Sequence, residues 1–115
     1  MNKVTILVPA PHCRIDVIKA GIIGGEPLAR FWNEDRDANY VELGSFYTDE
    51  FGESAAEEAF DLSNNPSRQD ERMLVQGRTE SLSVGGVVKL EVKSDTGCIS
   101  TAYYLCENVG WEVLS

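Results

Sequence analysis

Apolar residues in the first half of the chain form two runs with the pattern of β-strands. Residues 3–8 (Lys-Val-Thr-Ile-Leu-Val) are β-branched and almost continuously apolar, which is typical of a strand buried on both faces. Pro9 and Pro11 are expected to end this strand, because proline has no backbone N–H to donate to a sheet. Residues 40–48 alternate in character and predict a second strand.

The pattern of strands returns after Leu82. Apolar positions continue from there to Val92 and are interrupted at Gly85-Gly86, where we expect a bulge or a tight bend. Asp95-Thr96-Gly97 supplies a turn, so residues 99–106 should pair back as a hairpin. A further bend at 108–110 leads into a short last strand at 111–114.

Helical spacing is weaker near the N-terminus. Residues 14–20 predict a short helix with Ile15, Ile18 and Ile22 on its apolar side and Gly21 as its stop. Residues 28–32 predict a further helical turn that buries Phe31 and Trp32. The polar stretch 33–39 is expected to be a loop.

The clearest helix signal begins at Ser54. Ser54-Ala55-Ala56-Glu57 has the form of a capping box, in which the serine hydroxyl and the glutamate carboxylate each accept a hydrogen bond from an unpaired backbone N–H. Asn64-Asn65-Pro66 should end this helix, and a short second helix is expected over 69–75. The apolar side of the first helix comprises Ala55, Ala56, Ala59, Phe60 and Leu62, and the opposite side carries Glu57, Glu58 and Asp61.

Together these elements predict one α+β domain over residues 1–115. Its antiparallel sheet should include a C-terminal hairpin and pack against two or three short helices. The chain has no internal repeat and no linker long enough to separate two domains.

The net charge of −9 is concentrated in one segment. Residues 34–61 contain ten acids and a single base, Arg36, so this window carries the whole excess, and the other nine acids are balanced by nine bases. Such an acidic chain is a poor candidate for direct binding of DNA, RNA or an anionic membrane, all of which select basic surfaces.

Metal-binding patterns are incomplete. Asp35-x-Asp37-x-Asn39 matches the opening of an EF-hand, but Tyr40 stands where glycine is required and Phe46 where a bidentate glutamate is required. The possible zinc ligands lack the closely spaced pairs of structural sites, and we expect buried or inert cysteines instead. These ligands would be His12, Cys13, Cys98 and Cys106. We predict no metal and no cofactor.

Catalytic motifs are also missing from the sequence. His12 is the only histidine, its neighbour Cys13 would not ordinarily face it, and no Gly-x-Ser-x-Gly elbow occurs. The glycines at 21–25 are not followed by the residues of a phosphate-binding loop. Paired acids leave a minor hydrolase as the weakest hypothesis, and we predict that the chain is not an enzyme.

Three cysteines are too few, and odd in number, for a secreted disulfide scaffold. The N-terminal apolar run is too short for a signal peptide, and no apolar stretch approaches membrane-spanning length. These features predict a reduced, cytoplasmic protein.

Short motifs in the second half resemble a family of small uncharacterised proteins of phages, plasmids and integrative elements. The matching residues are Ala55-Ala56-Glu57-Glu58-Ala59-Phe60-Asp61-Leu62-Ser63-Asn64-Asn65-Pro66, Gly77-Arg78, Ser81-Leu82-Ser83-Val84-Gly85, Tyr104-Leu105-Cys106 and Gly110-Trp111. The chain departs from the family at Gly86, where aspartate is usual. The resemblance implies no activity, but it implies a mobile-element setting, in which anti-CRISPR and anti-restriction inhibitors are found.

We therefore predict a non-enzymatic inhibitor that binds a basic, nucleic-acid-binding surface of a host protein or protein complex in a bacterial cytoplasm, without contacting nucleic acid or membrane itself. An alternative is a regulatory or structural module that binds a partner through an edge strand or the hairpin. The predicted partner-binding residues are Glu34, Asp35, Asp37, Asp49, Glu50, Glu53, Glu57, Glu58 and Asp61.

Overall fold

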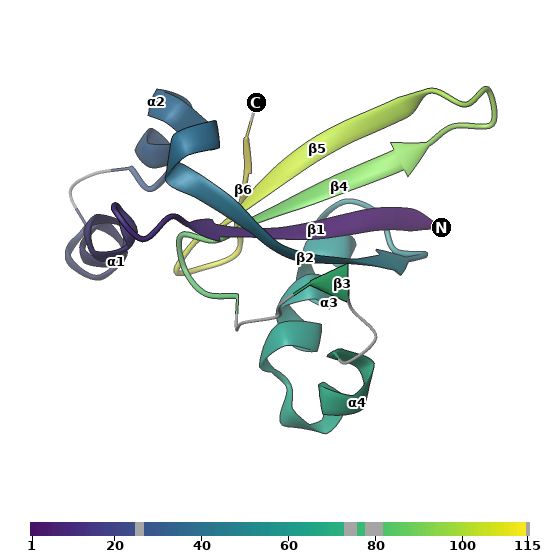
Figure 1. Ribbon diagram of the computed structural model, residues 1–115, viewed down its shortest axis with the longest axis horizontal. Coiled ribbons are helices and arrows are strands. Elements are labelled where there is room, and N and C mark those ends of the chain that lie inside the picture. Colours follow the sequence, from purple (N-terminus) through teal and green to yellow (C-terminus); the bar gives the residue numbers. More distant parts are fainter. Residues whose placement is uncertain (25–26, 73–75, 78–81, 115) are drawn as a thin grey trace.

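A single antiparallel sheet organises the protein (Figure 1). The computed structural model describes residues 1–24, 27–72, 76–77 and 82–114. Six strands pair in the order β3-β2-β1-β4-β5-β6, and each neighbouring pair is antiparallel. The strands are β1 (Asn2–Pro9), β2 (Tyr40–Thr48), β3 (Gln76–Gly77), β4 (Val87–Lys93), β5 (Ile99–Cys106) and β6 (Trp111–Leu114). The predicted α+β class is confirmed.

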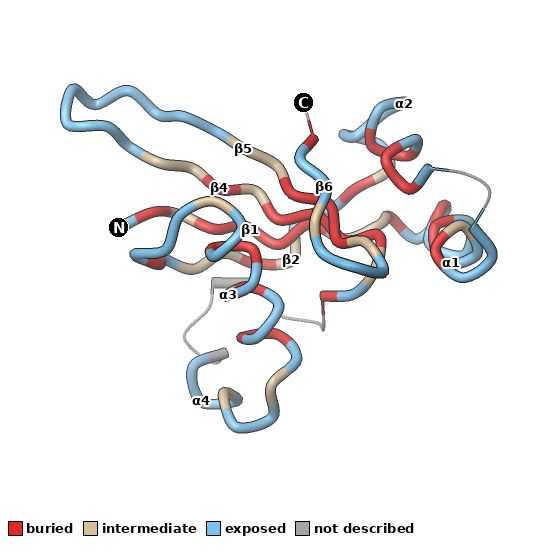
Figure 2. The backbone as a smooth tube through the Cα atoms, turned by 180° about the vertical axis from the view of Figure 1, so that it is seen from behind, coloured by how far each residue is buried: buried red, intermediate tan, exposed pale blue. Residues whose placement is uncertain are grey.

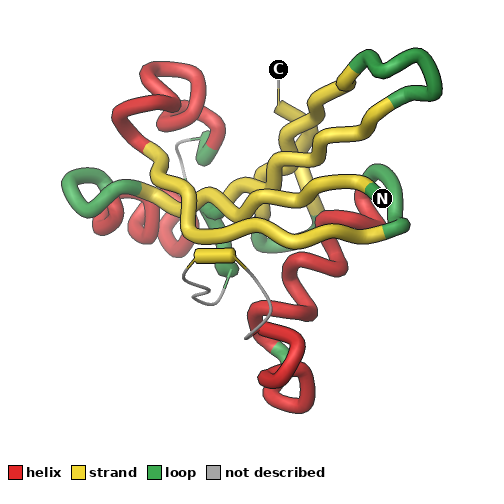
Figure 3. The backbone as a smooth tube through the Cα atoms, turned by 45° about the vertical axis from the view of Figure 1, so that its right-hand side comes forward, coloured by secondary structure: helices red, strands yellow, loops and turns green. Residues whose placement is uncertain are grey.

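Helices lie on both sides of this sheet (Figure 3). They are α1 (Arg14–Ile23), α2 (Ala29–Asn39), α3 (Glu53–Asn64) and α4 (Gln69–Arg72), with a 3₁₀ turn, η1 (Pro66–Arg68), between the last two. The predicted second helix over 69–75 is therefore α4 as far as Arg72, and residues 73–75 lie outside the described part of the chain.

One face of the sheet packs against α1 and α2. Leu7, Val87 and Leu105 are cross-strand neighbours on β1, β4 and β5, and all three are buried. The same hydrophobic cluster contains Phe31 and Trp32, as the sequence predicts. These two aromatic rings anchor α2 against the sheet.

The opposite face packs against α3. Because successive strand residues point to opposite faces, Ile6 and Val88 lie on the other side of the sheet from Leu7 and Val87. They form a second cluster with three alanines of α3, which let the helix backbone approach closely. The alanines are Ala55, Ala56 and Ala59, each with no exposed surface. The two helical layers therefore lie on opposite faces of one sheet.

The predicted C-terminal hairpin is confirmed. β4 and β5 pair from Val87↔Leu105 to Lys93↔Ile99, and the outer part of this hairpin projects from the fold as exposed chain (Figure 2). The predicted bend at Gly85-Gly86 is also confirmed. Gly85 has φ +93°, and a side chain on Gly86 would meet Leu82 Cδ1 at 2.5 Å. A side chain such as aspartate therefore cannot replace Gly86 without moving the buried Leu82.

The prediction of a loop at 33–39 is wrong, because α2 continues to Asn39. Its polar residues form the exposed side of a helix that Phe31 and Trp32 hold on the sheet. Asp35 interrupts the helix with extended backbone (φ −163°, ψ 85°), and its Oδ1 accepts a hydrogen bond of 3.2 Å from the backbone N–H of Ala38. The carboxylate thus caps the last turn after a kink.

The predicted apolar side of the first helix is also wrong. Ile15, Ile18 and Ile22 are 67%, 47% and 79% exposed, whereas Val17 and Gly21 are buried. Gly21 does not end the helix, because the missing side chain lets the backbone approach Val84, whose Cγ1 lies 3.0 Å from the position of a Cβ. The helix therefore packs through its smallest residues and exposes its largest.

The capping box predicted at Ser54 does not form. α3 begins at Glu53, its N-cap is Gly52 with φ +57°, and no side chain caps it. The carboxylate of Glu53 lies in the first turn instead, where it is favourably placed for the helix dipole. The predicted end of the helix is confirmed, because α3 stops at Asn64.

Candidate functional site

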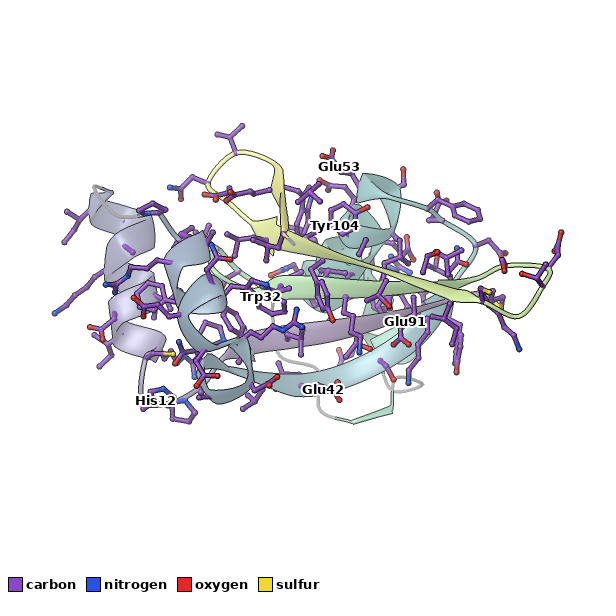
Figure 4. All side chains as sticks on the ribbon, turned by 90° about the horizontal axis from the view of Figure 1, so that it is seen from above. His12, Trp32, Glu42, Glu53, Glu91 and Tyr104 are labelled. Carbon is purple, nitrogen blue, oxygen red and sulfur yellow. The ribbon has the colours of Figure 1, made fainter. Side chains whose placement is uncertain are left out.

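The nine acids predicted to bind a partner do not form one surface. Glu34, Asp35 and Asp37 lie on α2, and the other six lie on the β2–α3 loop or on α3. Figure 4 looks onto the face that carries Trp32, Glu42 and Glu91, with α2 over one end of it, and shows Glu53 away from them on α3. β2 alone separates the two groups by about 26–30 Å along the chain, at 3.2–3.4 Å per residue.

The acids of α2 are mixed with bases. Glu34 lies 3.8 Å from Arg30, and the Arg36 guanidinium lies over the rings of Trp32 and Tyr103, at 5.4 and 5.3 Å from their centroids. A hollow of about 210 Å³ beside the helix is lined by equal numbers of acids and bases. The lining residues include Asp37, Glu42, Arg36 and Lys89. This end of the sheet is therefore close to neutral.

Arg68 compensates the acids at the C-terminal half of α3. Its guanidinium nitrogens lie 2.5 Å from Glu58 Oε1, 2.8 Å from Asp61 Oδ2 and 2.7 Å from Glu71 Oε2. The hydrogen bonds from Arg68 hold the pKa values of the Asp61 and Glu71 carboxyls below their usual ranges. Glu58 and Asp61 therefore serve an internal ion-pair network and are poor candidates for contacts with a partner.

The remaining four predicted acids lie together. Asp49 and Glu50 precede α3 directly, and Glu53 and Glu57 lie one turn apart on it, all four exposed. The Trp111 indole Nε1 donates a hydrogen bond of 2.6 Å to Glu57 Oε1, which brings β6 beside the helix.

This contact also brings Glu107, an acid from outside the sequence window, to the same place, where it and Glu57 line one hollow. Burial, together with a hydrogen bond to Glu112, raises the pKa of the Glu107 carboxyl. Burial and the nearby charges of Glu57 and Glu107 raise the pKa of the Cys106 thiol to about 11, so this thiol stays neutral at pH 7. We call the assembled surface the acidic strip; it comprises Asp49, Glu50, Glu53, Glu57 and Glu107. Glu112 pairs with Leu105 in the sheet, so its side chain points to the opposite face, which packs against α1 and α2.

Two aromatic rings lie within the acidic strip. Phe60 and Trp111 contact edge to face, with ring centroids 6.5 Å apart and an interplanar angle of 85°. Phe60 is 38% exposed and Trp111 is partly buried. A hollow of about 150 Å³ is lined by both rings and by Glu57, Cys106, Glu107, Asn108 and Gly110. Its lining contains carboxylates and no base.

Sequence reasoning missed Glu107 because it counted charge along the chain. Residues 62–115 contain seven acids and five bases, so a single acid does not stand out there. The available signal was local: residues 107–112 carry two acids, no base and the only tryptophan outside α2.

Within the described residues, no three His, Cys, Asp or Glu side chains are arranged to hold one metal ion. The residues considered for zinc lie apart and have other contacts. His12 Nε2 lies 3.0 Å from Asn39 Oδ1, and the buried Cys13 thiol donates to the backbone oxygen of Asn39. Of the cysteines predicted to be buried or inert, Cys13 and Cys106 are buried and Cys98 is exposed.

Comparisons with protein-family models, curated proteins and solved structures found no match to this chain. The resemblance to mobile-element proteins therefore stays a prediction. In the described part of the chain, no helix combines the length and the apolar character needed to span a membrane.

Proposed function

We propose that this protein is a non-enzymatic inhibitor that binds a basic, nucleic-acid-binding surface of a bacterial host-defence protein through the acidic strip. One observation carries the proposal: segments 49–57 and 107–111 bring together five acidic residues and contain no lysine or arginine. Grooves that track phosphates are lined with lysine and arginine, so a fixed row of carboxylates can compete for them.

The placement of charge supports the acidic strip over the full window predicted from sequence. Arg30 and Arg36 offset the α2 acids, and Arg68 offsets the C-terminal acids of α3. Phe60 and Trp111 add partly exposed aromatic surface. Aromatic residues are enriched among the few residues that contribute most of the binding energy of a protein interface. The resemblance to mobile-element proteins supports host defence as the setting.

The neighbouring carboxyls of Glu107 and Glu112 do not favour hydrolysis. Burial and a hydrogen bond with the Glu112 carboxyl raise the pKa of Glu107, which puts the two groups within hydrogen-bond distance. Glycosidases place their two carboxyl groups about 5–9.5 Å apart, to leave room for the sugar carbon or a water molecule. A direct hydrogen bond leaves no such space.

The test is capture followed by competition. Host proteins retained by the tagged chain from an expressing bacterium are identified by mass spectrometry and purified. We expect a nucleic-acid-binding defence protein whose DNA or RNA binding the chain blocks, with an affinity that falls about tenfold or more between 50 and 200 mM salt. A partner that binds the chain and its nucleic acid simultaneously, or binds independently of salt, contradicts the proposal.

A second candidate function is strand addition at β5. β6 pairs only with residues 103–106 of β5, so Ile99–Ala102 have a strand partner on one side only within the described residues. An extended peptide could pair there through its backbone. Such binding should be nearly independent of salt, and Ile99→Lys should abolish it while leaving an acidic-strip complex intact.

A further inference from the structure

The hollow between Phe60 and Trp111 has the chemistry of a cation site. We propose that it receives one arginine side chain of the partner, an inference that rests on the proposed function and names the contact at its centre. Two aromatic and two acidic residues from three segments of the chain line it: Glu57 and Phe60 on α3, Glu107 on the β5–β6 turn, and Trp111 on β6.

The charges of the lining select a positive group. Glu57 and Glu107 are its only ionisable residues apart from Cys106, whose thiol stays neutral. A guanidinium, which donates only, matches this set of acceptors.

The aromatic rings favour a planar cation. An arginine placed over an indole or phenyl face is attracted by the ring quadrupole. The chain already uses this contact elsewhere, where Arg36 lies over both Trp32 and Tyr103. Arginine also donates two parallel hydrogen bonds to one carboxylate, whereas lysine acts as a strongly hydrated point charge.

The size of the hollow limits the ligand to a side chain. Its volume of about 150 Å³ lies below the roughly 300–1,000 Å³ of pockets for drug-sized molecules. Glu57 Oε1 already accepts from Trp111, and Oε2 has no hydrogen bond within the described residues. Glu57 is thereby fixed by Trp111 with one oxygen still able to bind a donor.

The test uses three capped amino acids and needs no partner. N-acetyl-arginine amide, its uncharged isostere N-acetyl-citrulline amide, and N-acetyl-lysine amide are titrated while the two indole N–H signals are followed by NMR. Trp111→Phe assigns the signal of Trp111. We expect the arginine probe to shift the Trp111 signal saturably and leave that of Trp32 in place, with citrulline and lysine each at least tenfold weaker.

Variants locate the binding. Glu57→Gln and Glu107→Gln should each weaken binding of the arginine probe at least tenfold, whereas Asp95→Asn, which removes one charge in the exposed turn between β4 and β5, should change it less than twofold. Backbone amide spectra confirm that each variant is folded. Equal binding of arginine and citrulline, lysine binding as tight as arginine, or a response only at Trp32 overturns the proposal.

Failure of this inference differs from failure of the proposed function. If a captured partner binds Glu57→Gln and Glu107→Gln as tightly as wild type, the proposed arginine contact is wrong, but inhibition through the acidic strip is not contradicted. If the arginine probe binds specifically but no defence protein is captured, the cation site is supported and the proposed function is contradicted.

Discussion

Arg68 and Asp61 are joined by a contact of 2.8 Å between Nη1 and Oδ2. The same guanidinium also binds Glu58 and Glu71, so one base holds α3, η1 and α4 together at their polar surface. Because of this network, the acids of α3 are not all available to a partner. Two of the three acids on the polar side of this helix, Glu58 and Asp61, are internally paired, and the available charge lies toward the N-terminus of α3.

Removal of this base should destabilise the protein without unfolding it. Arg68→Gln leaves three carboxylates close together without a cation, and we expect a loss of about 1 kcal/mol, because the acids are 31–55% exposed and solvent screens them. Urea unfolding at pH 7 measures the change. Lys93→Gln, at an exposed residue of the hairpin, is the control and should stay within about 0.5 kcal/mol.

The stabilisation by Arg68 should disappear in acid. The pKa values of Asp61 and Glu71 are lower in the folded protein than in the unfolded chain, so the unfolded chain binds more protons as pH falls. Their contribution is present above about pH 4–5 and is lost as pH falls through the folded-state pKa values. The difference in unfolding free energy between wild type and Arg68→Gln should therefore shrink from pH 7 to pH 3; a constant difference would contradict this account.

Glu107→Gln should raise the free energy of unfolding at neutral pH, whereas Arg68→Gln should lower it. Burial and Glu112 raise the pKa of Glu107 in the folded state, so ionisation of this group costs stability at neutral pH, and the cost vanishes below the pKa of the unfolded chain, about 4.3. The variant should be more stable than wild type at pH 7 by less than about 1 kcal/mol, after allowance for solvent screening. Thermal melts at pH 7 and pH 3.5 test this, with an advantage expected only at pH 7.

The orientation of α1 can be tested by two substitutions on one helix. Val17→Ala removes buried volume and should cost about 2 kcal/mol. Ile22→Ser changes a side chain that is 79% exposed and should stay within about 0.5 kcal/mol. Equal losses, measured by urea unfolding, would mean that the isoleucines pack inward.

Strands and turns were predictable from sequence because their signals are local. The turn residues 95–97 and the continuous apolar run 3–8 each predict an element from the residues of that segment alone. The helices were harder, because tertiary contacts decide which face is buried. Gly21 packs closely because Val84 lies beside it, and nothing in the spacing of Ile15, Ile18 and Ile22 reveals that neighbour.

The candidate site could be predicted only in part for the same reason. Asp49, Glu50, Glu53 and Glu57 follow one another in the chain, so charge counting finds them. Glu107 joins them beside Trp111, whose contact with Glu57 spans 54 residues, and Arg68 compensates the charge of Asp61 across seven residues. Both effects depend on the paths of the chain between these residues.

The most direct test of the acidic strip compares two triple variants that remove the same charge. Asp49→Asn/Glu50→Gln/Glu53→Gln neutralises part of the strip, and Glu34→Gln/Asp35→Asn/Asp37→Asn neutralises the α2 acids; each changes the net charge from −9 to −6. We predict that the first weakens binding to the captured partner at 50 mM salt by about tenfold or more, and the second by less than about threefold. Equal losses, or a loss confined to the α2 variant, would contradict the assignment of the binding surface to the acidic strip.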